Sequence, residues 1–210
     1  MDYYGPTNEN ISTLISFIGY ISPSPIIQRS QNLFLPELHP IVPLNPESKK
    51  ISINPKGTYL IIGGSSGIGM HLAEHLKNKE VQNIIITGTR PKDKLLLSIS
   101  SLLGKRFRYV QNDILDKGSV SKLIDDLIHD FGRIDGIIFS AGVINYGSII
   151  NKSQEEFERV LQVKIIGAQN LSNALMNHHP GFVYTLSSIS ALTPGWAGGV
   201  LRPKLLVDGL

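Results

Sequence analysis

From residue 58 onward, the chain alternates between two patterns of apolar residues. Short apolar runs, typical of buried strands, are separated by stretches in which apolar residues recur every three or four positions, as on one face of a helix. The runs predict strands at Tyr59–Ile62, Ile84–Thr87, Phe107–Val110, Ile134–Phe139 and Phe182–Leu186. The periodic stretches predict helices at Gly67–Lys79, Lys92–Leu103, Ser119–Phe131 and from Ser153 to about Asn177.

The order of these elements predicts an α/β fold. Ser153 and Glu156 form the sequence pattern of a capping box, which marks the start of the last helix. Strands that are apolar on both faces and alternate with helices indicate a parallel sheet covered on both sides. Right-handed crossovers then give a doubly wound sheet of the Rossmann type.

Residues 1–57 differ from the rest of the chain. Prolines crowd into this part at Pro23, Pro25, Pro36, Pro40, Pro43 and Pro46. Proline lacks the amide donor that helices and central strands need, so we interpret this part as an extended linker. Ile11–Tyr20, which precedes these prolines, is expected to form a short helix or strand. The predicted division is therefore an N-terminal extension at 1–57 and a Rossmann domain at 58–210.

Composition narrows the classes of function. The chain of 210 residues is 41% hydrophobic and 18% charged, as in globular proteins, and its net charge of +3 is mild. No motif or basic stripe favours nucleic acid as a partner. The absence of cysteine excludes disulfides and thiolate metal sites, and it fits a reducing, cytoplasmic setting. No apolar run reaches the length of a membrane span, so we expect no membrane partner.

A glycine-rich turn is the strongest motif. It follows the first predicted strand, opens a helix and reads Gly63-Gly64-Ser65-Ser66-Gly67-Ile68-Gly69. Gly63 allows a sharp turn, Gly67 lets backbone amides approach a pyrophosphate, and Gly69 allows close helix packing. The helix N-terminus and the two serine hydroxyls add donors to an anion. The alternative is a glycine-rich turn that serves packing alone.

The second predicted strand ends in a cation. In units that bind NAD, an Asp or Glu at this place holds the 2′-hydroxyl of the ribose. Here the chain continues Thr87-Gly88-Thr89-Arg90, without a carboxylate. Arg90 would suit the 2′-phosphate of NADP through bidentate, charge-assisted bonds, and the alternative is a solvated surface arginine. We therefore expect NADP rather than NAD as the cofactor.

Several motifs resemble the ketoreductase domains of polyketide and fatty-acid synthases, within the short-chain dehydrogenase/reductase superfamily. In chain order they are GTYLIIGGSSGIG at Gly57–Gly69, Asn112-Asp113-Ile114, Phe139-Ser140-Ala141-Gly142-Val143, the long helix from Phe157 to Leu171, and Leu186-Ser187-Ser188-Ile189-Ser190. The resemblance implies that Asp113, with Ile114 beside it, contacts adenine. It also implies that Ser140, Ala141 and Gly142 support the sheet beside the cofactor. Two departures are Ile62 in place of the usual Thr and Thr89 as an insertion before Arg90.

The resemblance also implies catalytic residues. The family reduces a carbonyl with a serine and a tyrosine on the oxygen and a lysine that lowers the tyrosine pKa. Ser188 matches the serine by position, and Ser187 is the nearest other candidate. The alternative is that Ser188 only ends the strand. Lys164 matches the lysine of the long helix, and the alternative is a solvated helix lysine. Lys204 stands where the family has Asn or Lys, but Val200 stands where it has the tyrosine.

The resemblance implies a reductase that converts a carrier-bound β-ketoacyl thioester into its β-hydroxyacyl form with NADPH. Its partners would be the acyl carrier and other synthase domains. The missing tyrosine and the end of the chain soon after the fifth strand predict a C-terminally incomplete copy with impaired activity. The open sheet edge would favour pairing with a partner, such as a second copy in a homo-oligomer. The alternatives are a non-catalytic nucleotide-binding or structural remnant and a free-standing reductase.

Two histidines lie four residues apart on one predicted helix. His71 and His75 have the spacing of a metal-binding pair, but no third ligand is evident. We interpret them as surface histidines and predict no metal site.

Overall fold

The computed structural model describes residues 27–29, 32–34, 52–92, 104–144 and 151–188. Within them the main feature is a five-stranded sheet, in which every neighbouring pair of strands is parallel. The strands lie in the order β5-β4-β3-β6-β7. In chain order their bounds are β3 Thr58–Ile62, β4 Asn83–Gly88, β5 Phe107–Gln111, β6 Gly136–Phe139 and β7 Val183–Thr185.

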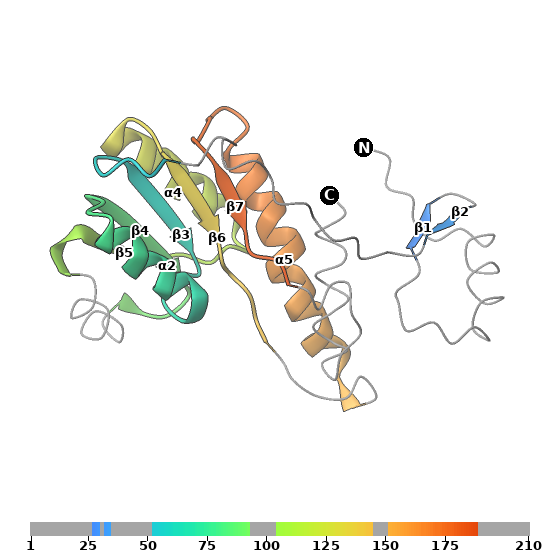
Figure 1. The fold of residues 1–210 in the computed structure, drawn as a ribbon. Helices are drawn as coiled ribbons and strands as arrows, with labels where there is room; N and C mark the ends of the chain where they lie inside the picture. The colour runs from blue at the N-terminus through green and yellow to red at the C-terminus, as the bar shows by residue number, and fades with distance from the viewer. Residues whose placement is uncertain (1–26, 30–31, 35–51, 93–103, 145–150, 189–210) are drawn as a thin grey trace, which may run out of the picture.

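In the described part of the chain, three α-helices cover the two faces of the sheet (Figure 1). They are α2 at Gly67–Asn78, α4 at Lys117–Phe131 and α5 at Gln154–Ala174. A 3₁₀ turn, η1 at Gly104–Arg106, precedes β5. The predicted doubly wound α/β fold is confirmed, and so is each predicted strand and helix that falls on the described residues. The helix predicted at 92–103 and the element predicted at 11–20 lie almost wholly outside them.

Side-chain caps decide where two of the helices begin. The Asp116 side chain accepts a hydrogen bond from the Ser119 amide at 3.1 Å and so caps α4. The predicted capping box is present at α5, where the Ser153 hydroxyl accepts from the Glu156 amide and the Glu156 carboxylate accepts from the Ser153 amide. Helix α5 ends at Ala174, about one turn earlier than predicted, and its last carbonyls are closed by turn hydrogen bonds.

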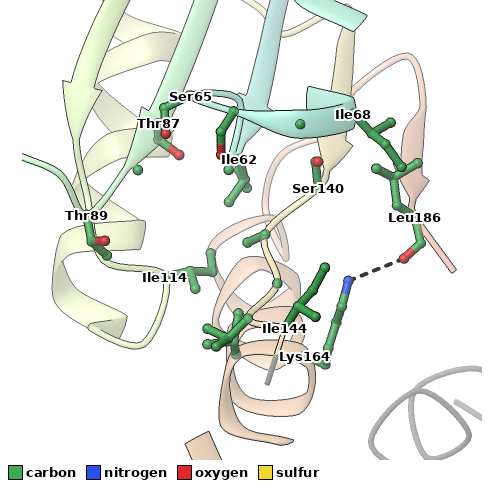
Figure 2. Close-up of a pocket in the computed structure, with 18 of the residues that line it drawn as sticks. Ile62, Ser65, Ile68, Thr87, Thr89, Ile114, Ser140, Ile144, Lys164 and Leu186 are labelled. Atoms are coloured by element: carbon green, nitrogen blue, oxygen red, sulfur yellow. Dashed lines mark hydrogen bonds between the residues drawn. The ribbon is translucent and has the colours of Figure 1, made fainter. Parts of the chain in front are cut away.

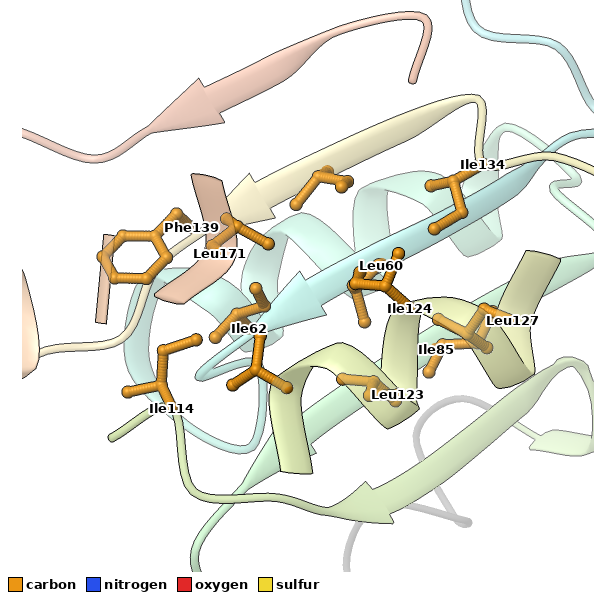
Figure 3. Packing of buried hydrophobic residues seen from close by; sticks show 12 residues of the cluster. Leu60, Ile62, Ile85, Ile114, Leu123, Ile124, Leu127, Ile134, Phe139 and Leu171 are labelled. Carbon is orange, nitrogen blue, oxygen red and sulfur yellow. The ribbon is translucent and has the colours of Figure 1, made fainter. Parts of the chain in front are cut away.

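The central strand β3 separates two hydrophobic cores. Its five residues are all buried, and alternate side chains point to opposite faces. Tyr59 and Ile61 pack with α2, whereas Leu60 and Ile62 pack with α4 and α5. Figure 3 shows the second core, in which Leu60 and Ile62 meet side chains from α4 and β6. Burial on both faces explains why this strand is an uninterrupted apolar run.

The two edge strands are less buried than predicted, since strands with two apolar faces were expected to be covered on both sides. In β5 only Tyr109 is buried, and all three residues of β7 are exposed. An edge strand has a neighbour on one side only, so fewer side chains cover it. Among the described residues β7 forms one edge of the sheet.

Among its described residues, the proline-rich part contains a pair of strands that the sequence did not predict. Strand β1 at Ile27–Arg29 pairs with strand β2 at Asn32–Phe34 in an antiparallel hairpin. The hairpin lies between Pro25 and Pro36, so its short strands need no amide from a proline. The division of the chain at residue 57 stays a prediction.

Asp135 fixes the amino end of the sheet. It is buried just before β6, accepts a hydrogen bond from the Thr58 amide at 2.9 Å and pairs with Arg133. Burial alone would raise the pKa of this carboxyl, but the bonds from Thr58 and Arg133 outweigh it and hold the pKa below its usual range. The first residue of the central strand is thereby tied to the start of β6.

Candidate functional site

A cavity of about 480 Å³ opens at the carboxyl ends of the strands (Figure 2). Ligand sites of doubly wound sheets lie at this end, and the volume falls within the usual range for small-molecule pockets. Its walls come from the turn after β3, the end of β4, the segments after β5 and β6, helix α5 and the segment after β7. Residues from six separate parts of the chain therefore meet in one cavity.

The glycine-rich turn forms one wall, and its geometry requires glycine. Gly63 has a positive φ of +78°, and a Cβ there would lie 2.6 Å from the Ala141 Cα. A Cβ on Gly69 would lie 2.7 Å from the Gly63 carbonyl oxygen and 2.9 Å from the Ser140 Oγ. The predicted sharp turn and close packing are both confirmed. Gly64 and Gly69 lie outside the cavity lining, whereas Gly63, Ser65, Ser66, Gly67 and Ile68 belong to it.

The N-terminus of α2 is open toward the cavity. Gly67 has a φ of +56°, and a Cβ there would meet no atom within 4 Å. The Ser66 side chain makes no capping hydrogen bond, and the first turn has no acidic residue. Helices α4 and α5, in contrast, are both capped by side chains. Free amides and the positive end of the helix dipole at a cavity wall suit an anion such as a pyrophosphate.

The segment after β4 forms the adjoining wall and carries Arg90, and the Thr87 carbonyl just before it accepts from the Gly63 and Gly64 amides. This exposed arginine lines the cavity together with Thr87, Gly88 and Thr89. Tyr109 on β5 holds the segment, because its hydroxyl lies within hydrogen-bonding distance of the Gly88 and Arg90 carbonyl oxygens. The structure therefore places a cation in the same cavity as the open end of α2.

The segment after β5 adds polar groups to the cavity. Asn112, Asp113 and Ile114 all line it. The Asn112 amide donates to the Ser119 hydroxyl at 2.6 Å, and Asp113 accepts from the Leu115 amide at 3.0 Å. Both residues of the predicted adenine contact, Asp113 and Ile114, are thus brought to the cavity.

Asn170 of α5 supports the segment after β5 through hydrogen bonds. Its buried amide donates to the carbonyl oxygens of Ile114 at 2.9 Å and Leu115 at 3.1 Å. This contact was not predicted from the sequence. The only signal was a polar residue on the buried face of an amphipathic helix, which does not by itself name its partner.

Lys164 is buried at the edge of the cavity. Only 8% of the residue is exposed, its Nζ donates to the Leu186 carbonyl at 3.3 Å, and it lies 5.6 Å from the centre of the Phe139 ring (Figure 2). Ser140, Ala141 and Gly142 line the cavity beside it. The alternative of a solvated helix lysine is therefore wrong. A buried ammonium group at a cavity wall is typical of a functional lysine.

Of the remaining candidate catalytic residues, the structure brings one serine to the cavity lining. Leu186 and Ser187 line the cavity, whereas Ser188 follows as a half-buried residue that is not part of the lining. Lys204 and Val200 lie outside the described residues. The choice between Ser187 and Ser188 therefore stays open.

Two histidines with the spacing of a metal-binding pair lie on α2. His71 and His75 are exposed, and His71 pairs with Glu74 at 3.3 Å. In the described part of the chain no three His, Asp or Glu side chains gather as metal ligands. None of the helices described there is long and apolar enough to cross a membrane.

Comparison with known proteins identifies a family. The family model of the KR domain matches residues 57–198. Polyketide synthase PksM of Bacillus subtilis is 32% identical over 153 residues, which are 71% of this chain and 4% of the synthase. The chain thus spans a small part of the relatives that it matches.

Solved structures agree with this family and fold. An N-terminal ketoreductase from the macrolactin assembly line is 30% identical with a TM-score of 0.70, covering 77% of this chain and 34% of that one. ElxO with NADP bound is 23% identical with a TM-score of 0.67, covering 73% of this chain and 64% of that one. At that identity ElxO supports the fold alone.

Proposed function

The chain belongs to the KR-domain family, and on this premise we propose that it binds NADPH in the cavity and reduces a β-ketoacyl thioester to the β-hydroxyacyl form. One observation carries the proposal. The uncapped end of α2, open behind Gly67, and the Arg90 cation both line the same cavity. A pyrophosphate and a 2′-phosphate are the two anionic groups that NADPH would bring to such walls.

The other parts of the cavity suit the rest of the dinucleotide. Asp113 and Ile114 would hold the adenine, through a carboxylate acceptor and an apolar contact. Ile68 and Ile144 line the cavity, although 62% and 64% of their surfaces are exposed. Exposed apolar side chains at a cavity wall favour a flat organic ring or an acyl chain.

Carbonyl reduction would use residues near Lys164. When bound, NADPH would supply the hydride. Ser188 or Ser187 would donate a hydrogen bond to the carbonyl oxygen, and the Lys164 ammonium would stabilise the negative charge that develops there. This oxygen would then take a proton from solvent water, since Val200 has none to give. Lys204 is proposed as a further catalytic residue by resemblance alone.

A second candidate function is nucleotide binding without reduction. The observation that favours it is Val200, which stands where the family pattern has its tyrosine. A valine has no proton to donate, so general-acid catalysis from this position would be lost. The chain would then be a nucleotide-binding or structural domain of a larger synthase.

The proposed partners follow from the relatives. PksM is a polyketide synthase of which the chain matches 4%, so other domains surround the matching region in that protein. We propose that this chain likewise acts beside other synthase domains, on an acyl group held by a carrier protein.

Titration with NADPH, followed by its fluorescence, tests the proposal. We expect saturable binding that is stronger for NADPH than for NADH. Arg90→Ala should weaken NADPH binding about 10- to 100-fold and leave NADH binding unchanged, because hydrogen bonds to charged groups contribute ~1.5–3 kcal/mol. Arg108→Ala is the matched control, since Arg108 is exposed on β5, pairs with Asp130 and lies outside the cavity lining. No binding at millimolar NADPH would refute the proposal.

Turnover separates the two candidate functions. NADPH oxidation with a β-ketoacyl thioester, lost in Lys164→Met and in one of the two serine-to-alanine variants, would support reduction. Tight NADPH binding without turnover would support the nucleotide-binding module instead.

A further inference from the structure

Side chains of β5 hold the backbone that carries Arg90. The Tyr109 hydroxyl shares its hydrogen between the carbonyl oxygens of Gly88 at 2.9 Å and Arg90 at 2.8 Å. The Gln111 side-chain amide donates to the Thr89 carbonyl oxygen at 3.3 Å. Three successive carbonyls, those of the last residue of β4 and of the two residues after it, therefore accept hydrogen bonds from β5.

These bonds constrain a segment that has no regular structure of its own. Strand β4 ends at Gly88, and both Thr89 and Arg90 are exposed. Such a segment ordinarily samples several backbone conformations, and its cation would move with them. With the carbonyls on either side of Thr89 bonded to one hydroxyl, the backbone at Arg90 is held in a single orientation.

The bonds also place the carbonyl oxygens favourably for an anion. The Gly88 and Arg90 oxygens each accept a hydrogen bond from Tyr109, which is outside the cavity lining, so one lone pair of each oxygen is engaged. Carbonyl oxygens that faced the cavity would repel a phosphate. The same wall therefore offers the positive charge of Arg90 with less of the opposing negative dipoles.

Tyr109 is built into the fold in a way that preserves this donor. It is 3% exposed, and burial raises the pKa of its hydroxyl, an effect that the nearby Arg90 charge only partly offsets. The hydroxyl therefore stays protonated at neutral pH. A Cβ on Gly88 would lie 2.9 Å from the Ser65 Oγ and 3.2 Å from the Tyr109 hydroxyl oxygen. Gly88 thus leaves room for Tyr109 and for the glycine-rich turn to meet at this point.

We propose that Tyr109 is a positioning residue for cofactor specificity, which holds Arg90 where it binds the 2′-phosphate and so sets the preference for NADPH over NADH. The inference rests on the proposed function and deepens it. Tyr109 acts through Arg90 and touches no part of the cofactor itself. Its removal should therefore affect NADPH alone.

The test compares dissociation constants of NADPH and NADH for the full chain of 210 residues. Tyr109→Phe removes only the hydroxyl and should weaken NADPH about 10-fold, while NADH stays within about 2-fold. Tyr59→Phe is the matched control. Tyr59 is equally buried, and its hydroxyl accepts from the Asn54 amide at 2.8 Å, but it is outside the cavity lining. This control should leave both constants unchanged.

A double-mutant cycle shows whether Tyr109 acts through Arg90. In an Arg90→Ala background, Tyr109→Phe should cause no further loss of NADPH affinity, because the group that it positions is gone. Gln111→Ala is a second variant on the same segment, in case Tyr109→Phe does not fold. Its side chain is exposed, and its loss should lower NADPH affinity about 2- to 3-fold, again without affecting NADH.

The outcomes separate this inference from the function on which it rests. If the unmodified chain prefers NADPH through Arg90 but Tyr109→Phe keeps that preference, the inference is wrong and the proposed function stands. Equal weakening of NADPH and NADH, or additive losses in the double variant, would also overturn it. If the unmodified chain fails to bind NADPH, the proposed function itself fails and the inference falls with it.

Discussion

Replacement of Gly63 by alanine tests the contact on which the cavity is built. Gly63 has a φ of +78°, and a Cβ there would lie 2.6 Å from the Ala141 Cα and 2.7 Å from its amide nitrogen. The substitution therefore adds two costs, an unfavourable backbone conformation and a collision with backbone that has no flexible side chain to move. The turn after β3 and the segment after β6 would have to separate.

The size of each cost can be worked out. A left-handed conformation costs a residue other than glycine about 1–2 kcal/mol. Overpacking that forces backbone shifts costs about 1–3 kcal/mol more. Gly132, which ends α4, isolates the first cost, because its φ is +77° and a Cβ there would meet nothing within 4 Å. The free energy of unfolding of Gly63→Ala should therefore fall about 1–3 kcal/mol further than that of Gly132→Ala.

Thermal unfolding followed by circular dichroism measures this difference. For a chain of this length about 3 °C corresponds to 1 kcal/mol, so Gly63→Ala should unfold about 3–9 °C below Gly132→Ala. It should also bind NADPH more weakly, since Gly63 lines the cavity and Gly132 does not. Equal unfolding temperatures for the two variants would refute the reasoning, because the approach of Gly63 to Ala141 would then contribute nothing.

Three further predictions concern residues that support the fold and the cavity. Asp135→Asn should lower the free energy of unfolding by about 1.5–3 kcal/mol at pH 7 in urea titrations, because it weakens the bonds from Thr58 and Arg133. The pKa of Asp135 is lowered in the folded chain, so its carboxylate contributes to the free energy of unfolding above about pH 4, and this contribution is lost as the pH falls through the folded pKa. The free energy of unfolding of Asp135→Asn should therefore fall less on acidification than that of the unmodified chain. Asn170→Ala should destabilise the chain by about 1–3 kcal/mol and weaken binding of 5′-AMP, measured by calorimetry, since the carbonyls of Ile114 and Leu115 lose their donor. Ser153→Ala should cost about 1 kcal/mol in the same urea titrations without changing nucleotide affinity, because it removes only the cap of α5.

Most of the fold could be predicted from the sequence because local pattern and tertiary environment agree. In β3 every residue is buried, so the strand is a continuous apolar run, and its shortness and the glycines that follow it distinguish it from a buried helix. The start of α5 is predicted by its capping box, because the side chains of Ser153 and Glu156 each accept a hydrogen bond from the other's backbone amide. Such signals depend on residues close together in the chain, which is why they are readable without a structure.

The edges of the sheet were harder to predict. Val183 and Tyr184 have high strand propensity, and an apolar run of this kind suggests a buried strand. They are nevertheless exposed, because β7 has a neighbour on only one side among the described residues. The hairpin of β1 and β2 was missed for a related reason, since the surrounding prolines dominate the local pattern.

Part of the site depends on contacts that no local pattern records. The face on which Lys164 lies was undecided in the sequence, because it is flanked by the apolar residues Val163 and Ile165. In the structure it is buried against Phe139 and Leu186. Tyr109 similarly reads as an ordinary strand residue, since its partners are carbonyl oxygens about twenty positions earlier in the chain.

The strand order explains why residues so far apart share one cavity. From β3 the chain first builds outward to β4 and β5, then returns to lay β6 along the other side of β3. The connections that follow β3 and β6 therefore leave the sheet toward opposite faces, α2 on one and α5 on the other, and a crevice opens where they part. Gly63 and Ala141 meet at that point, with Gly67 on one side of it and Lys164 on the other. Because this crevice is a consequence of topology, the specificity of the site has to come from its walls, and we propose that Arg90, with its support from Tyr109, is the part of those walls that distinguishes one dinucleotide from another.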